Sequence, residues 1–274
     1  MPVNHIIHQP NYSMISNNKS VNSGIRIAVI TGAGSGMGRY FAYYAGFFAT
    51  DIDELWLVGR DKRKLYKTAS RVSRKCRCIS ADLSDDEEYR ALISIVQDTA
   101  PDIRLLVNNA GIGIMGDFAR LKPKENELMA DINCRALTRL TADCIPFMSR
   151  GSHIINMASA AAFLPQPGFA VYAASKSYVY SLSKALSHEL RKKKIYVTAV
   201  CPGCVDTPFI SKAEKYEKMK DYKKPFMAEA KKVVLQAYRD AYRGWNVSVY
   251  GVGMNCFRVA AKILPDELIL RMFF

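Results

Sequence analysis

Long apolar runs are absent from this sequence, and no stretch approaches the roughly 18 consecutive apolar residues that a transmembrane helix needs. Residues 1–24 are mostly polar and lack the continuous apolar segment of a signal peptide, so we expect a disordered leader there. The seven cysteines are odd in number and scattered over 274 residues, which argues against a disulfide framework and for reduced thiols. These absences predict a cytoplasmic protein with no transmembrane segment.

Acidic residues are also in short supply, with 25 Asp and Glu against 39 Lys and Arg and a formal net charge of +14. Such a surplus can attract nucleic acid or an anionic membrane surface. The basic residues, however, gather at 60–77, 191–194 and 212–232, with no interleaved aromatic platform and no recognisable nucleic-acid-binding module. Runs of this kind usually form solvated helix faces, so we expect no nucleic-acid partner and keep a polyanion-binding surface only as an alternative.

Short apolar runs alternate with segments of helical length. Buried strands are expected at 25–30, 55–58, 76–80, 103–107, 153–157, 195–200 and 247–250. Helical patterns at 37–49, 85–98, 123–148 and 171–193 lie between them. This alternation, without a composition break, predicts one α/β domain over 25–250: a Rossmann-type doubly wound parallel sheet of about seven strands, with helices on both faces.

Two further segments do not fit the alternation. Residues 208–225 are polar and charged and follow the sixth strand, where a mobile lid over a ligand would lie, although an ordinary surface loop fits equally well. Residues 251–274 are rich in apolar side chains but too interrupted by charge and proline to span a bilayer. We expect this C-terminal extension to pack on the pocket or on a subunit interface.

A glycine-rich loop, TGAGSGMG at 31–38, follows the first expected strand and precedes a helical pattern. It does not fit G-x-G-x-x-G, but it fits T-G-x-x-x-G-x-G through Gly32, Gly36 and Gly38. Glycines at these positions let the backbone approach a pyrophosphate at a helix N-terminus. A plain strand-to-helix turn is the alternative, but four glycines in seven residues favour a nucleotide site.

The spacing Tyr-x-x-x-Lys occurs at 172–176, 180–184 and 216–220, so the spacing alone cannot identify chemistry. Only Tyr172 and Lys176 lie on a helix that begins near the carboxyl ends of the strands, with a serine, Ser159, at the end of the fifth strand. Tyr180 lies about 12 Å further along the helix axis, and Tyr216 lies in the charged segment. Tyr172 and Lys176 are therefore the candidate pair.

Taken together, the motifs resemble those of the short-chain dehydrogenase/reductase family from about Ile25 to Thr207. They are TGAGSGMG, the Asp82 and Leu83 of ADLSD, NNAG, the Asn133 of DINCRA, Ser159, YAASK and CPGCVDT. The resemblance implies a nicotinamide-dependent oxidoreductase with catalytic Asn133, Ser159, Tyr172 and Lys176, active as a homodimer or homotetramer. It implies cofactor contacts at Gly32, Ser35, Gly36, Met37, Gly38, Arg60, Asp82, Leu83, Asn109, Ala110, Gly111, Tyr172, Lys176, Pro202, Gly203, Val205 and Thr207.

These side chains can carry hydride chemistry. Tyr172 can donate a proton to a ketone oxygen, and we expect the Lys176 ammonium to lower the pKa of Tyr172 and to anchor the cofactor ribose. Ser159 can hold the substrate oxygen, and the resemblance implies that Asn133 ties a water to Lys176. Expected pocket residues are all uncharged, which predicts an apolar carbonyl or alcohol substrate, such as a steroid, lipid-chain or aromatic ketone. They are Ile112, Ala160, Phe163, Leu164, Phe169, Cys204, Val205 and Phe209.

The end of the second expected strand, VGRDKRK at 58–64, indicates the cofactor. An NAD-preferring relative would carry an acid at Gly59 to hold the ribose hydroxyls. Here Gly59 leaves room for a 2′-phosphate and Arg60 can donate two parallel hydrogen bonds to it, which predicts NADP(H). The alternative is that Arg60 simply opens a basic helix.

Two other possibilities stay open. Cys201 and Cys204 form a C-x-x-C that could be a redox dithiol or half of a zinc site, but no second such pair exists, so we expect no metal. A catalytically silent NADP-binding sensor or scaffold of the same fold is the rival to an enzyme.

Overall fold

The centre of the protein is a parallel sheet of seven strands. The structure, a computed structural model, describes residues 24–219 and 227–273. The strands are β1 (Arg26–Thr31), β2 (Glu54–Gly59), β3 (Lys75–Ser80), β4 (Asp102–Asn108), β5 (His153–Met157), β6 (Tyr196–Val200) and β9 (Val247–Ser248). They pair in parallel in the order β3-β2-β1-β4-β5-β6-β9. The strand order reverses between β1 and β4, which confirms the predicted doubly wound sheet.

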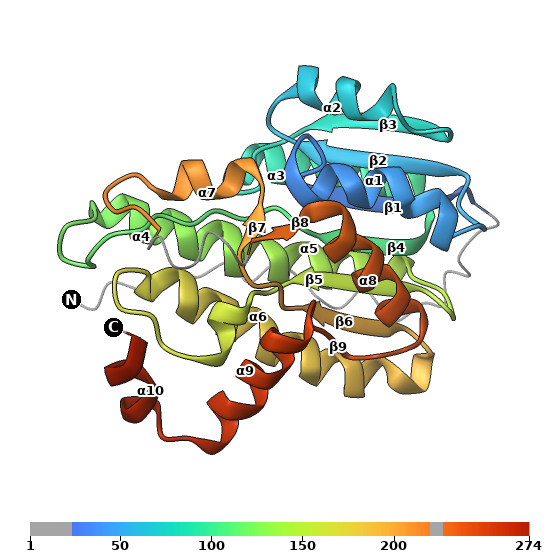
Figure 1. Cartoon of the computed structure of the whole chain (residues 1–274). Coiled ribbons are helices and arrows are strands. Elements are labelled where there is room, and N and C mark those ends of the chain that lie inside the picture. The colour runs from blue at the N-terminus through green and yellow to red at the C-terminus, as the bar shows by residue number, and fades with distance from the viewer. Residues whose placement is uncertain (1–23, 220–226, 274) are drawn as a thin grey trace, which may run out of the picture.

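Helices cover both faces of the sheet (Figure 1). On one face pack α1 (Gly36–Phe48) and α8 (Ala230–Tyr242), and on the other α3 (Asp86–Thr99), α5 (Leu137–Cys144) and α6 (Ala170–Glu189). Side chains alternate along β1, so Ala28 and Ile30 join the cluster under α1 and α8, whereas Ile27 and Val29 join the opposite cluster. Because both faces are covered, β1, β2 and β5 are buried along almost their whole length, whereas burial alternates along the edge strand β3.

Smaller elements complete the fold. They are α2 (Lys62–Ala69), α4 (Pro123–Ala130), α7 (Pro208–Ala213), α9 (Val252–Ile263), α10 (Asp266–Phe273) and the strands β7 (Val205–Asp206) and β8 (Ala228–Glu229), which pair with each other. The one long helix expected at 123–148 is instead α4, a π-helical turn (Asp131–Ala136), α5 and a 3₁₀ turn (Ile145–Phe147). None of the helices traced in residues 24–219 and 227–273 has the length and apolar character needed to cross a bilayer.

The segment expected as a lid or loop is partly helical. Its described part contains α7, in which Ala213 is fully buried and accepts a hydrogen bond from the Met115 N–H at 2.8 Å. Residues 220–226 of this segment, and residues 1–23 of the expected leader, lie outside the described residues. The described part of the segment is therefore packed against the loop that follows β4.

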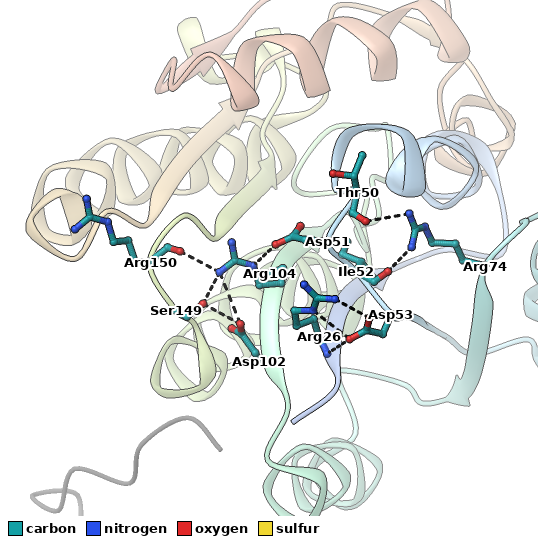
Figure 2. A network of polar contacts seen from close by, with 10 residues as sticks. All are labelled: Arg26, Thr50, Asp51, Ile52, Asp53, Arg74, Asp102, Arg104, Ser149 and Arg150. Carbon is teal, nitrogen blue, oxygen red and sulfur yellow. Dashed lines mark hydrogen bonds and ion pairs between the residues drawn. The ribbon is translucent and has the colours of Figure 1, made fainter. Parts of the chain in front are cut away.

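A network of ion pairs joins the amino ends of the strands (Figure 2). Arg104 of β4 donates to the Asp51 carboxylate at 2.7 Å and lies 3.7 Å from the Asp102 carboxylate. Beside it, Arg26 of β1 donates through its guanidinium to Asp53 at 3.0 Å. Asp51 and Asp53 lie just before β2, so these contacts fix the start of β2 against β1 and β4. The carboxyl ends of the same strands lie at the opposite edge.

Candidate active site

A cleft of about 1270 Å³ runs along the carboxyl ends of the strands and collects almost all of the expected site residues. Its walls include Gly32, Ser35, Gly36, Met37, Arg60, Asp82, Leu83, Asn109, Ala110, Gly111, Ser159, Tyr172, Lys176, Pro202, Gly203, Val205 and Thr207. These residues lie on α6, on the first turn of α1, on β7 and on loops that follow the strands, at the edge where ligands bind in open parallel sheets. Two expected site residues, Gly38 and Asn133, do not line the cleft and lie behind it.

The glycine-rich loop presents bare backbone at the start of α1. Gly36 has a φ of +52°, a conformation that favours glycine. A side chain at Gly38 would collide with the carbonyl oxygen of Gly32, so this position needs glycine for close packing of the helix on the loop. Ser35 makes no side-chain capping bond to α1, and the first turn contains no acid. This geometry fits a dinucleotide pyrophosphate, which the free N–H groups and the helix dipole would hold.

Thr31, at the end of β1, ties the glycine-rich loop to the loop after β4. Its Oγ1 accepts hydrogen bonds from the N–H groups of Asn109 at 3.0 Å and Ala110 at 2.9 Å. The Asn109 side chain donates back to the Thr31 carbonyl at 2.9 Å. Thr31 was not among the predicted site residues, although its position at the end of a strand and directly before a glycine could have indicated this role. The two loops that flank the cofactor end of the cleft are thus one hydrogen-bonded unit.

Tyr172 lies in the first turn of α6 and is almost fully buried. Its ring stacks on Phe169, with 4.1 Å between centroids, and packs against Phe209 at 5.6 Å. Burial raises the pKa of Tyr172 to about 12, and a hydrogen bond with Ser159 acts in the opposite direction. The expected lowering of this pKa was wrong for the protein without cofactor, because removal of the phenol from water disfavours the phenolate more than its neighbours stabilise it.

Lys176 is buried one turn further along α6. Its Nζ donates to the Met157 carbonyl at 2.7 Å and lies 5.6 Å from the centroid of the Tyr172 ring. Burial lowers the pKa of Lys176 to about 8, and this outweighs the opposite effect of the neighbouring Cys134 and Cys201. The same burial therefore keeps the proton on Tyr172 and loosens the proton on Lys176.

Asn133 lies in the π-helical turn between α4 and α5, and its side chain is almost fully buried. Its Oδ1 accepts from the Ile112 N–H at 2.9 Å, and its Nδ2 donates to the Ile112 carbonyl at 2.9 Å and to the Ser175 Oγ at 3.0 Å. Both amide hydrogens are thus used within the protein. The Asn133 side chain therefore fixes the loop after β4 against α6. Single π-helical turns of this kind often occur at functional sites.

Arg60 follows β2 and points toward the loop after β3. Its Nη1 lies 3.5 Å from the Asp82 carboxylate, and its side chain is 60% exposed. The pKa of Asp82 stays below its usual range because hydrogen bonds from Ser84 and the nearby Arg60 charge outweigh its partial burial. Asp61 caps α2 by accepting from the Lys64 N–H at 3.1 Å. Asp61 lies two positions after Gly59, where an NAD-preferring relative would carry its ribose-binding acid. Its carboxylate caps α2 instead.

The residues that line the substrate end of the cleft match most, but not all, of the expected pocket residues. Seven of the eight expected pocket residues line it, but Phe163 turns away to pack on Tyr180 at 5.6 Å and Phe257 at 6.4 Å. The lining also includes charged side chains, which come from the segment expected as a lid or loop and from β8 and α8. They are Lys212, Lys215, Glu217, Lys218, Glu229 and Lys232. Lys215 pairs with Glu125 and Lys232 with Glu229, which neutralises part of this charge.

The C-terminal extension forms one wall of the same cleft. Met254 and Phe257 of α9 line it, whereas Val252 and Ile263, with exposed fractions of 82% and 74%, face away. The inner side of α9 therefore lies on the cleft, which is one of the two placements expected for the C-terminal extension.

The tyrosines of the other two Tyr-x-x-x-Lys pairs do not line the cleft. Tyr180 does not line it, and the Tyr216 hydroxyl donates to Glu125 at 3.2 Å. His153 stacks between Tyr196 and Tyr242, and burial lowers its pKa to about 4. Within residues 24–219 and 227–273, no group of three or more His, Cys, Asp or Glu side chains could hold a metal ion.

Comparison with known proteins identifies the relatives of this chain. A family model described as short chain dehydrogenase matches residues 26–218. An uncharacterized oxidoreductase of Staphylococcus epidermidis is 29% identical over 197 residues, which is 71% of this chain and 84% of the relative. A short-chain dehydrogenase from Sphingobium yanoikuyae in complex with NADPH superposes with a TM-score of 0.74 at 28% identity, covering 91% of this chain and 96% of that one. A 3-ketoacyl-(acyl-carrier-protein) reductase from Brucella melitensis complexed with NADH gives a TM-score of 0.70 at 26% identity, covering 82% and 95%.

Proposed function

Because the chain belongs to the short-chain dehydrogenase family and is an oxidoreductase of that family, we propose that it transfers a hydride between NADP(H) and the carbonyl or secondary alcohol of an apolar substrate. The observation that carries the proposal is the meeting of Ser159, Tyr172 and Lys176 in one cleft with the glycine-rich loop. A silent sensor of the same fold has no need of a buried lysine beside a buried tyrosine.

The proposed reaction assigns one role to each side chain. NADPH, when bound, supplies the hydride. The hydroxyls of Ser159 and Tyr172 hold the ketone oxygen, and Tyr172 gives it the proton, which its raised pKa keeps on the phenol until charge develops on the substrate. Lys176 anchors the cofactor ribose and, as an ammonium, stabilises the phenolate left behind. Asn133 holds Ile112 in the cleft wall through its side chain, and its tie to Lys176 through a water remains a prediction.

The choice of NADP(H) rests on Gly59 and Arg60. A side chain built at Gly59 would meet only Leu65, so the space beside the β2 end is open to a phosphate, and Arg60 lines the cleft there. The relative from Sphingobium yanoikuyae, solved with NADPH, agrees with this choice, whereas the one from Brucella melitensis binds NADH. The proposal of NADP(H) therefore rests on Arg60 rather than on the cofactors that these relatives bind.

The substrate proposed is a ketone with a bulky apolar group. Phe169 and Phe209 pack against Tyr172, and Met254 and Phe257 add apolar surface to the same cleft, which suits a steroid, lipid-chain or aromatic ketone. We further propose that the protein is a cytoplasmic homodimer or homotetramer.

The test follows NADPH absorbance with a panel containing a steroid ketone, an aromatic ketone and a 3-ketoacyl ester. We expect turnover of at least one ketone by the wild type and by Tyr180→Phe, the matched control on the same helix. Tyr172→Phe should bind NADPH, measured by cofactor fluorescence, without turnover. NADPH binding with no turnover of any ketone would favour the sensor.

A further inference from the structure

Helix α6 carries the sequence Tyr-x-x-Ser-Lys twice, as YAASK at 172–176 and YSLSK at 180–184. The two serines, Ser175 and Ser183, are both buried, with exposed fractions of 4% and 0%. Each donates to a backbone carbonyl in the preceding turn, Ser175 to Tyr172 at 2.7 Å and Ser183 to Val179 at 2.6 Å. The two copies of the motif are therefore alike in their local bonds along the helix.

The likeness extends to a buried asparagine beside each serine. Ser175 accepts from Asn133 Nδ2 at 3.0 Å, and Ser183 accepts from Asn156 Nδ2 at 3.0 Å. In both copies the serine hydroxyl thus joins an asparagine of another element to the backbone of α6. Its two hydrogen bonds use the hydroxyl once as donor and once as acceptor.

The copies differ in what the asparagine holds. Asn133 grips both the N–H and the carbonyl of Ile112, which lines the cleft in the loop after β4. Asn156 lies in β5 and accepts from Asn108 of β4 at 2.8 Å, so its other partner lies inside the sheet. Only the first copy therefore connects α6 to the wall of the cleft.

We propose that Ser175 is a positioning residue for the reaction, which locks the first turn of α6 to Asn133 and, through Asn133, to Ile112. Without the Ser175 hydroxyl, one Asn133 amide hydrogen is left buried without a partner, and the Asn133 side chain is free to turn away from Ile112. The position of the cleft wall is then no longer fixed relative to the turn that carries Tyr172. Displacement of a catalytic group by about 1 Å can lower a rate by roughly a hundredfold.

The experiment compares Ser175→Ala with Ser183→Ala, which removes an equivalent hydroxyl from the same helix. The first readout, independent of turnover, is amide hydrogen exchange at Ile112 in the full chain. We expect Ser175→Ala to speed exchange at Ile112 by roughly threefold to tenfold, and Ser183→Ala to leave it unchanged. Asn133→Ala should speed it too, and adding Ser175→Ala to that variant should have no further effect. Equal exchange at Ile112 in both serine variants would overturn the proposal.

The second readout rests on the proposed function. For a ketone that the wild type reduces, we expect Ser175→Ala to lower kcat by roughly tenfold to a hundredfold, with KM within about twofold. Ser183→Ala should keep kcat within about twofold, although both variants should lose similar thermal stability, and Ser175→Thr should restore kcat. Equal kcat values in the two alanine variants refute positioning by Ser175. A wild type that reduces no ketone would instead refute the proposed function. Amide hydrogen exchange at Ile112 would then still test whether Ser175 positions Asn133 and Ile112.

Discussion

Replacement of Arg60 by alanine should weaken the preference for NADPH over NADH. A hydrogen bond to a charged group contributes roughly 1.5 to 3 kcal/mol. Arg60 is 60% exposed and already lies 3.5 Å from Asp82, so water and this carboxylate both compete with a 2′-phosphate. The lower end of the range therefore applies, and we expect the ratio of kcat/KM for NADPH to that for NADH to fall about tenfold.

The assay measures kcat/KM for both cofactors in the wild type, in Arg60→Ala and in Arg63→Ala. Arg63 is an exposed residue of α2 that does not line the cleft, so its loss changes the net charge equally without touching the proposed phosphate position. Ionic strength is kept fixed because screening weakens contacts to phosphate. A wild type that prefers NADH, or equal losses in the two variants, would refute the assignment of Arg60.

Three other outcomes follow from burial and charge. In reduction of a ketone, kcat/KM should fall as pH rises through about 8, because Lys176, whose pKa burial lowers to about 8, loses its ammonium there while Tyr172 keeps its proton. A flat profile between about pH 6 and about pH 10 would contradict this role. Tyr180→Phe should leave the thermal midpoint unchanged or slightly raised, because the Tyr180 hydroxyl is buried and has no hydrogen-bond partner among residues 24–219 and 227–273. A clear fall in the thermal midpoint would contradict this. Arg104→Met should lower the free energy of unfolding by about 3 kcal/mol, measured by urea denaturation, because it leaves the Asp102 carboxylate, 14% exposed, without its cation.

Much of the frame could be predicted from the sequence because its strands are buried on both faces. In β1 the four residues 27–30 are apolar without interruption, and the turn residues that follow the strand mark where it ends. The strands β7 and β8 were missed because two residues each are too few to show a period. The π-helical turn at Asn133 was missed because it depends on contacts with Ile112 and Ser175, which lie far apart in the sequence.

The residues that form the site could be predicted from the sequence, but the direction of the Tyr172 pKa shift and part of the charge around the site could not. Motif order was enough to bring Ser159, Tyr172 and Lys176 into one cleft. The direction of the Tyr172 pKa could not be predicted, because it depends on how deeply Phe169 and Phe209 cover the phenol. Glu229 and Lys232 were missed for a similar reason, since only tertiary packing brings them to the cleft, whereas the other charged residues of the lining belong to the segment expected as a lid or loop.

The ion pairs around Arg104 lie at the amino ends of the strands, whereas every candidate catalytic side chain lies at or beyond the carboxyl ends. A substitution in a cleft loop therefore leaves the ion pairs of Arg104 and Arg26 in place. Effects on substrate choice and effects on these ion pairs can thus be measured independently, because they arise at different ends of the same strands.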